Sequence, residues 1–241
     1  VLIDMYSISV TPVSIAIAGG GLAGGLLALS LLRHTQQSVL LCEKNTRDFF
    51  ESRWCIEKSS FDDRALALSW SSIVFFRTLG IWDDLAPYAE PMQRVEVSEK
   101  GRWGVTHLDA SGLPCDALGY VIEIRALLRV IYRHLDQYIN QGRWICLWGE
   151  SLSHLEIGEK NAQFLVSGQL YSADLLVVAE GIEGGLCQQL GIAYTEHAYH
   201  EVALYANVVC AKPKRFTAFE RFLQSEVLAL LPMTENRYSL I

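Results

Sequence analysis

The sequence predicts an α/β protein that combines a parallel sheet flanked by helices with a second, antiparallel sheet. The β-branched run Val13–Ala18 leads through a glycine cluster into the Leu- and Ala-rich segment Leu22–His34, and a second apolar run, Ser38–Glu43, follows. This strand–helix–strand order is typical of a parallel sheet. After Gln93 the pattern changes to alternating apolar and polar residues, which indicates antiparallel strands.

The helices are predicted from apolar residues at helical spacing and from stop signals. Gly80 ends the second helix as a C′ glycine, and Pro87 ends a single helical turn. In the helix after residue 124, Leu127, Leu128 and Ile131 begin one apolar stripe. The predicted helices are Leu22–His34, Ser69–Leu79, Trp82–Ala86, Arg125–Tyr138 and Gly185–Leu190.

Most of the remaining segments are predicted to be strands. The turn at Lys100 and Gly101 joins Gln93–Ser98 to Trp103–Leu108 as a hairpin. Asp174–Ala179 is apolar after its first residue and is predicted as a core strand. The other predicted strands are Val13–Ala18, Ser38–Glu43, Tyr120–Glu123, three or four short strands between Trp144 and Asp174, and the segments 202–211, 216–222, 227–233 and 237–241.

We expect two domains, each assembled from separate stretches of the chain. A chain of 241 residues suffices for one large domain or two small ones. Residues 5–88 and 119–192 carry the strand–helix pattern and form the α/β domain. Residues 89–118 and 193–241 contribute the antiparallel sheet of a partial second domain.

Composition excludes several classes of protein. Hydrophobic residues make up 51% of the chain, so it can bury a core. The formal net charge is -7 and no basic run occurs, so we expect no nucleic-acid partner. The six cysteines form no CxxC pair and are expected to be small buried side chains in a reducing compartment.

The uncharged segment Tyr6–Leu32 is long enough to suggest a membrane span. Two features oppose that interpretation. Five glycines lie in the middle of the segment, where each would destabilise a helix by about 1 kcal/mol. The run Val13–Ala18 also has the composition of a buried strand. We therefore expect no membrane helix there.

A glycine motif of the form GxGxxG follows the first strand and opens the first helix. Gly19 allows a tight turn, Gly21 lets the backbone approach a pyrophosphate, and Gly24 lets the helix pack against the strand. The helix N-terminus favours an anion, and Glu43, at the end of the next strand, can accept hydrogen bonds from ribose hydroxyls. The alternative is a glycine-rich turn without a ligand.

Two further motifs are less specific. Asp62, Asp63 and Arg64 precede a helical segment, and on the residues alone they favour a surface charge cluster. The apolar strand that ends in Glu180 and Gly181 places a carboxylate at a strand's carboxyl end. Ordinary junctions between a strand and a turn have the same appearance.

Together these motifs resemble a known family. GGGLAGGLLAL at 19–29, FDDRALALS at 61–69, LGIWDDLAP at 79–87, LLVVAEG at 175–181 and AFERFLQSEVLALLPM at 218–233 are similar to the FAD-dependent aromatic hydroxylases of ubiquinone biosynthesis, which share the p-hydroxybenzoate hydroxylase fold. VSEKGRWG at 97–104 and LGYVIE at 118–123 are most similar to the member that hydroxylates 2-polyprenyl-6-methoxyphenol. The resemblance covers about residues 13–241.

The resemblance implies a Rossmann-like FAD-binding domain with an interleaved substrate domain, and a set of cofactor-binding residues. Arg64, with Asp62 as its acid, and Arg125 would lie near the flavin. Glu180 and Gly181 occupy a motif thought to serve both FAD and NAD(P)H, the co-substrate. The residues implied for the ADP half of FAD are Gly19, Gly21, Leu22, Ala23, Gly24, Glu43 and Lys44.

The chain departs from the family pattern at two places. Glu180 stands where the family has Asp, and residues 182–185 lack the usual Ser and Arg, which puts the role of this segment toward the reductant in doubt. The family's second flavin motif, a Gly-Asp pair, would lie beyond Ile241. We expect a fragment with an incomplete substrate domain, inactive alone, whose apolar strands at 202–211 and 227–231 favour self-association.

The function implied for the complete protein is hydroxylation of a lipophilic, polyprenylated phenol with NAD(P)H and O2. Two alternatives remain open: another flavin-dependent oxidoreductase, and a nucleotide-binding subunit without catalysis. We expect a cytoplasmic protein that could lie at the inner membrane or join a ubiquinone-synthesis complex. We expect no metal, because His197 and His200 enter a strand, where a spacing of three does not place both rings on one face.

Overall fold

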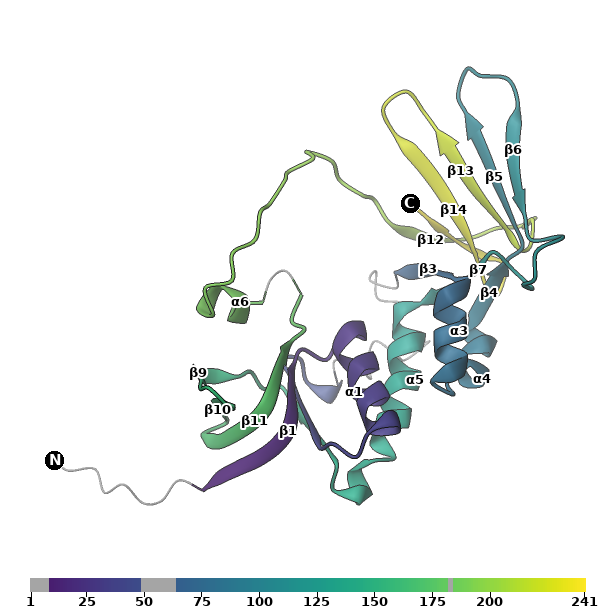
Figure 1. Ribbon diagram of the computed structural model, residues 1–241. Coiled ribbons are helices and arrows are strands. Elements are labelled where there is room, and N and C mark those ends of the chain that lie inside the picture. Colours follow the sequence, from purple (N-terminus) through teal and green to yellow (C-terminus); the bar gives the residue numbers. More distant parts are fainter. Residues whose placement is uncertain (1–8, 49–63, 182–183) are drawn as a thin grey trace. The chain divides into compact units, whose positions relative to one another are not determined.

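The computed structural model describes residues 9–48, 64–181 and 184–241 (Figure 1). These residues divide into two compact units, one formed by residues 9–48, 131–181 and 184–196 and the other by residues 64–130 and 197–241. Predictions about Cys55, Asp62, Asp63, Ile182 and Glu183 lie outside the described residues. Both units combine helices with sheets, so the predicted α/β class is confirmed.

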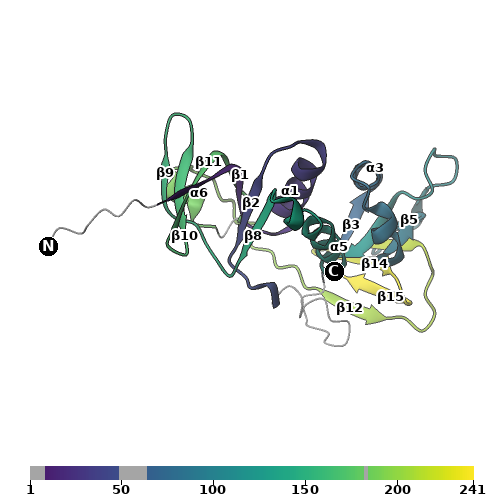
Figure 2. The same ribbon diagram turned by 90° about the horizontal axis from the view of Figure 1, so that it is seen from below.

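The first unit contains a six-stranded sheet in the order β8-β2-β1-β11-β10-β9. Strands β8, β2, β1 and β11 are parallel neighbours, whereas β10 and β9 continue the sheet in antiparallel pairs (Figure 2). The strands are β1 (Val10–Ala18), β2 (Val39–Glu43), β8 (Trp144–Trp148), β9 (Ser153–Ile157), β10 (Ala162–Val166) and β11 (Gln169–Val178).

Helix α1 (Leu22–His34) connects β1 to β2 and has the predicted bounds. A short helix, α6 (Leu186–Gln189), follows β11. The core includes apolar residues of the parallel strands, such as Ala16 and Leu40, and of the antiparallel strands, such as Phe164 and Val166. The antiparallel strands therefore pack onto the parallel part of the sheet.

Strand β11 differs from the predicted core strand in its length and burial. It runs over ten residues instead of six, and it lies between β1 and β10. Leu175 is nevertheless 53% exposed. The last residues of β11 pair only with β1, because the pairing with β10 ends at Ala173, so this half of the strand has no neighbour on its other side within the described chain.

The second unit contains a three-stranded sheet, β3-β7-β4, and a six-stranded sheet in the order β12-β15-β14-β13-β5-β6. Helices α3 (Trp70–Thr78) and α4 (Trp82–Leu85) and a 3-10 turn η1 (Ala86–Tyr88) join β3 to β4. The strands are β3 (Ala65–Ser69), β4 (Ala89–Met92), β5 (Arg94–Glu99), β6 (Val105–Asp109), β7 (Gly119–Glu123), β12 (Ala206–Val209), β13 (Thr217–Phe222), β14 (Val227–Met233) and β15 (Arg237–Leu240).

The larger sheet joins two stretches of chain, as predicted, but it is not wholly antiparallel. The hairpin β5–β6 is confirmed, and β13 pairs with β5 in parallel (Figure 1). Ala65, Met92 and Val121 of the smaller sheet pack against Ala218 and Met233 of the larger one. Apolar side chains at 202–211 and 227–231 are exposed, namely Val202, Leu204, Val208, Val209, Val227 and Leu228. The self-association expected from them stays a prediction.

The compact units have different boundaries from the predicted domains. Residues 64–88 and 119–130 were predicted with the α/β domain, whereas the structure places them in the second unit. The reason is strand pairing: β7 pairs with β3 and β4, and β14 contacts both β4 and β7. Compactness does not assign function, so the predicted functional division stays a prediction.

Helix α5 (Ile124–Asp136) begins in the second unit and ends in the first. It is followed by a 3-10 turn, η2 (Ile139–Gln141), so the predicted helix to Tyr138 is two residues too long. No helix in the described part of the chain is long and apolar enough to cross a membrane.

Candidate functional site

The glycine turn lies where the carboxyl ends of β1, β2 and β11 meet. The Gly19 N–H donates to the Cys42 carbonyl at 2.8 Å, and the Ala179 N–H donates to the Ala18 carbonyl at 2.7 Å. Gly19 has a φ of 105°, and a side chain there would collide with the Ala179 carbonyl. Only glycine fits this turn, because the backbone is left-handed and lies close to a neighbouring strand.

Gly20 is held by two buried side chains. Its N–H donates to Glu43 Oε2 at 2.6 Å, and its carbonyl accepts a hydrogen bond from the Tyr132 hydroxyl, also at 2.6 Å. A methyl group on Gly20 would lie 2.5 Å from the Tyr132 oxygen and 3.0 Å from Glu43 Cβ. Gly20 is therefore required by close packing on the inner side of the turn.

Gly21 and Gly24 serve different purposes. Gly21 is the N-cap of α1, where no side chain caps the helix, and a side chain built there would meet no atom within 4 Å. A methyl group on Gly24 would collide with the Gly19 carbonyl and lie 3.3 Å from Ile17 Cγ2. Gly24 thus brings α1 close to β1, while Gly21 borders open space. The first N–H groups of a helix have no intrahelical partner, so they can bind an anion in that space.

Glu43 is only 5% exposed, and both of its carboxylate oxygens are used. Oε1 accepts hydrogen bonds from the Asn45 N–H at 2.9 Å and from Asn45 Nδ2 at 2.6 Å, while Oε2 binds Gly20. A carboxylate has about four acceptor positions. Oε2 therefore keeps acceptor capacity for a ligand hydroxyl. Lys44 is exposed.

Burial alters the titration of two groups beside the turn. Burial raises the pKa of the Tyr132 hydroxyl far above its usual range, and Cys146 and Glu43 add to the shift. The hydroxyl therefore stays protonated and remains a hydrogen-bond donor. Burial also raises the pKa of the Cys42 thiol to about 12, with a contribution from Glu150. Cys42 is thus an inert apolar side chain.

Glu180 lies next to the turn but faces its own loop. The Gly19 backbone approaches the peptide between Ala179 and Glu180 closely. Glu180 Oε2 accepts a hydrogen bond from the Leu186 N–H at 3.3 Å, at the start of α6. Gly181 has a φ of 77°, and Gly184 lies against the Glu180 side chain. The additional methylene of Glu, compared with Asp, gives this carboxylate the reach to cap α6.

The predicted arginines form a second group of residues, in the other unit. The Ile124 N–H donates to the Arg64 carbonyl at 3.0 Å, which places Arg64 beside the start of α5. Arg125 Nε and one of its terminal nitrogens donate to Glu123 Oε2 at 3.1 and 2.9 Å. Arg237 donates to Glu123 Oε1 at 2.7 Å, and all three side chains are largely buried.

The glycines, Glu43 and Arg125 were predicted from the sequence, but three side chains that the structure links to them by hydrogen bonds, Tyr132, Glu123 and Arg237, were not. Tyr132 lies 112 residues from Gly20, and Arg237 lies 114 residues from Glu123. No local motif marks either contact. Glu123 could have been found, because it ends a short strand immediately before the helix that carries Arg125.

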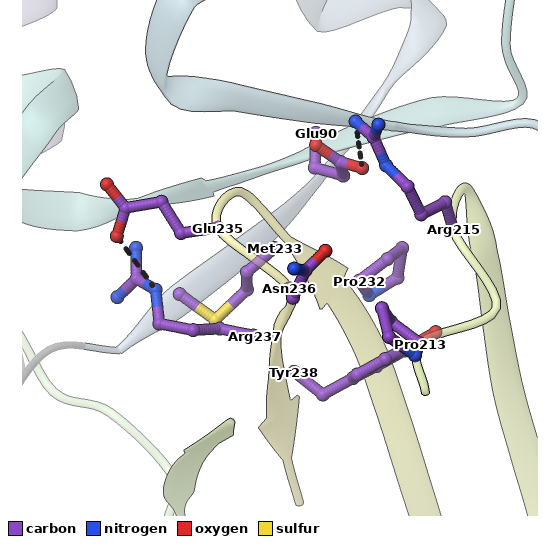
Figure 3. A pocket seen from close by; sticks show the side chains of 9 residues that line it. All are labelled: Glu90, Pro213, Arg215, Pro232, Met233, Glu235, Asn236, Arg237 and Tyr238. Atoms are coloured by element: carbon purple, nitrogen blue, oxygen red, sulfur yellow. Dashed lines mark ion pairs between the residues drawn. The ribbon is translucent and has the colours of Figure 1, made fainter. Parts of the chain in front are cut away.

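A small pocket lies on the second unit near the turn between β14 and β15 (Figure 3). Glu90 is buried in it and forms an ion pair with the exposed Arg215 at 3.7 Å. Burial raises the pKa of the Glu90 carboxyl, against the opposing effect of Arg215. This pair was not predicted from the sequence, and no predicted site residue lines the pocket.

Metal-ligating side chains do not gather in groups of three or more within residues 9–48, 64–181 and 184–241. His197 and His200, the HxxH pair, are exposed and precede β12.

Comparison with solved structures defines the class of fold. The Pseudomonas aeruginosa protein PqsL, in complex with 2-aminobenzoylacetate, matches 95% of this chain with a TM-score of 0.78 at 19% identity, over 60% of its own length. The p-nitrophenol 4-monooxygenase PnpA of Pseudomonas putida matches 95% with a TM-score of 0.73 at 14% identity, over 57% of its length. The described chain therefore has the fold of the matching part of flavin-dependent monooxygenases of known structure.

Comparison with curated sequences confirms the predicted resemblance to ubiquinone-biosynthesis hydroxylases. The 3-demethoxyubiquinol 3-hydroxylase of Escherichia coli is 28% identical over 95% of this chain. The ubiquinone hydroxylase UbiL of Rhodospirillum rubrum is 26% identical over 94%, and the human mitochondrial ubiquinone biosynthesis monooxygenase COQ6 is 22% identical over 96%. The chain spans 57% of the first relative and 51% of each of the others. No family model matches the chain.

Proposed function

We propose that the glycine turn and Glu43 bind the ADP moiety of FAD in a Rossmann-like arrangement. The observation that carries this proposal is the Gly20 N–H bound to buried Glu43, with open space beside Gly21 at the start of α1. The pyrophosphate would lie against the N–H groups of Gly21, Leu22 and Ala23. The ribose would contact Glu43 and the adjoining Lys44.

The residues present are suited to this group. Open space beside Gly21 lets phosphate oxygens approach the backbone, whereas atoms of the protein itself occupy the space beside Gly19, Gly20 and Gly24. Glu43 offers unused acceptor capacity but no donor, which matches ribose hydroxyls and disfavours a phosphate at that position. These features support a dinucleotide cofactor more than a glycine turn without a ligand.

For the complete protein we propose monooxygenation of a lipophilic, polyprenylated phenol in ubiquinone biosynthesis. The resemblance to three hydroxylases of that pathway across nearly the whole chain supports this activity. A bound flavin supplies the redox chemistry, with NAD(P)H as reductant and O2 as oxidant. The protein's part is to bind the cofactor, orient the substrate and exclude water.

The remaining predicted site residues have proposed roles near the flavin or at the border of the cofactor. Arg64 and Arg125 would lie near the flavin, and Glu123 would orient Arg125 through its two hydrogen bonds. Glu180 and Gly181 would border the cofactor. Because the Glu180 carboxylate caps α6, its contribution would come through the shape of its loop instead of a direct hydrogen bond.

We also propose that the protein acts in the cytoplasm at a lipid surface, where such a substrate would dissolve. The tips of the β5–β6 and β13–β14 hairpins lie side by side, joined by a hydrogen bond from the Lys100 N–H to the Phe222 carbonyl at 2.9 Å (Figure 1). Trp103 is fully exposed at this end, and Phe222 and Val227 are partly exposed. Tryptophan is enriched at membrane interfaces, which suits this surface to contact a bilayer.

The first experiment is calorimetric titration of this chain with ADP. We expect saturable binding at one site, weakened in a Glu43→Ala variant by about 1–3 kcal/mol because polar partners are left unpaired. Unchanged affinity in that variant would remove Glu43 from the site. Exposed Glu156 on β9 provides the control, as Glu156→Ala.

The second experiment tests the reaction with the full-length protein. We expect a flavin absorption spectrum, NAD(P)H oxidation that depends on a phenol, and rescue of a bacterial strain that lacks the methoxyphenol hydroxylase step. A flavin with NAD(P)H oxidation but no hydroxylated product would favour another flavin oxidoreductase. Absence of a flavin would favour a nucleotide-binding subunit without catalysis.

A further inference from the structure

Tyr132 lies deep in the first unit, far in sequence from the glycine turn that it contacts. It is 2% exposed on the last part of α5, and its ring packs against Trp148 with 4.8 Å between ring centroids. The polar end of this side chain has a defined target: the hydroxyl donates to the Gly20 carbonyl at 2.6 Å.

The end of α5 that carries Tyr132 is itself fixed against the rest of the unit. Arg33 of α1 contacts His134 Nδ1 at 2.9 Å, and Arg47 pairs with Asp136 at 2.7 Å. Ile131 lies directly against Gly25, where an added methyl group would be 3.2 Å from its Cγ2. These contacts therefore hold the Tyr132 hydroxyl in a defined position relative to the glycine turn.

The geometry of the peptide bond gives this hydrogen bond a consequence for the next residue. The Gly20 carbonyl and the Gly21 N–H belong to one planar, trans peptide unit, so they point in opposite directions. Because Tyr132 binds the carbonyl on the buried side, the Gly21 N–H is directed away from α5. Gly21 is the residue that borders open space at the start of α1.

Glu43 controls the other peptide unit of Gly20. The Gly20 N–H belongs to the peptide between Gly19 and Gly20 and is bound to Glu43 Oε2. Both dihedral angles of Gly20 are thereby restrained, one through its N–H and the other through its carbonyl. Glycine loses more conformational freedom on ordering than other residues, so an unrestrained Gly20 would leave the turn with several orientations.

We propose that Tyr132 is a positioning residue that orients the Gly20–Gly21 peptide, so that the Gly21 N–H faces the phosphate-binding side of the turn. The inference rests on the proposed ADP site. It predicts that loss of the Tyr132 hydroxyl weakens binding of the phosphates and leaves binding of the ribose unchanged, whereas loss of Glu43 affects the ribose and the turn together.

The variant Tyr132→Phe tests this assignment, because it keeps the ring and removes only the hydroxyl. We expect its dissociation constant for ADP to rise about fivefold to tenfold, as for one lost hydrogen bond. Its affinity for adenosine, which has no phosphate, should change less than twofold. Tyr171→Phe is the control, since Tyr171 lies in the same unit and its ring stacks on Phe164, 5.9 Å away. The control should bind both ligands as the wild type does.

Amide NMR spectra of the same variants, recorded without ligand, separate the inference from the proposed function. In Tyr132→Phe the Gly20 and Gly21 amide signals should shift or broaden, while the amide signals of Leu29 and Leu32, farther along α1, should not change. Unchanged Gly21 signals would overturn the inference. Equal weakening of ADP and adenosine would also overturn it, since that result indicates a general loss of structure. If the wild type does not bind ADP, the proposed function fails, and the spectra still decide how the peptide is held.

Discussion

Replacing Gly24 and Gly21 by alanine, one at a time, separates the two purposes of the glycine motif. In Gly24→Ala the new methyl group would collide with the Gly19 carbonyl, a backbone atom that cannot move without separating α1 from β1. Overpacking of this kind costs typically about 1–3 kcal/mol, and a rigid backbone contact favours the upper end. Alanine stabilises the helix by about 1 kcal/mol relative to glycine, because its helix propensity is higher. We expect a net loss of about 2 kcal/mol.

Thermal unfolding followed by circular dichroism measures this loss. For a protein of this size, about 2 kcal/mol corresponds to a fall in Tm of roughly 4–8 °C. In the matched variant Gly21→Ala the methyl group meets no atom within 4 Å, so the expected loss of stability is only that of alanine at a helix N-cap, about 0.5–1 kcal/mol. Its affinity for ADP should nevertheless fall about tenfold or more, because the methyl group occupies the approach to the backbone. A stable Gly24→Ala variant, or a Gly21→Ala variant with unchanged ADP affinity, would refute this division of roles.

Three further substitutions address other parts of the account. Glu43→Gln replaces one carboxylate acceptor by an amide donor that faces the N–H of Gly20 or Asn45, so the affinity for ADP should fall about tenfold. The Tm should also fall, because a charge-assisted hydrogen bond worth about 1.5–3 kcal/mol is lost, and an unchanged Tm in thermal unfolding would contradict this. The raised pKa of Cys42 means that the folded state holds the thiol proton more tightly than the unfolded state. Stability is then lost as pH rises from about 9 towards 12, by up to about 1.4 kcal/mol per pH unit, and Cys42→Ala should show a shallower loss in urea unfolding at pH 7 to 11. Trp103→Ser should reduce binding to vesicles of phosphatidylglycerol and phosphatidylethanolamine about tenfold in co-sedimentation, because the exposed Trp103 side chain would no longer be buried in the bilayer, and equal binding would exclude the hairpin tips as the contact surface.

The first strand–helix–strand unit could be predicted closely because its signals are local. The glycines and the leucine-rich run fix α1 at both ends, and β2 begins one residue from its predicted start. Strands β3 and β4 could not be predicted. β3 has the sequence ALALS, made largely of good helix formers, and β4 contains Glu90 and Pro91. Both are strands because β7 pairs with them, and that pairing depends on tertiary structure.

The candidate site divides in the same way. The glycines and Glu43 follow a spacing that can be recognised in sequence, since only helix α1 and strand β2 lie between the glycine turn and Glu43. The contacts that hold them in place cannot be recognised, because Tyr132 reaches Gly20 across 112 residues. The orientation of Glu180 also required the structure, since the sequence indicates a longer side chain but not the Leu186 N–H that it binds.

The central claim, that the turn after β1 binds ADP, is tested most directly by amide NMR during titration with ADP. The N–H groups of Gly21, Leu22 and Ala23 should show the largest shifts, with smaller shifts at Asn45 through Glu43. All should saturate with one dissociation constant, and adenosine alone should shift Asn45 but not Ala23. Shifts confined to the second unit, or no shifts at the start of α1 at millimolar ADP, would contradict the claim.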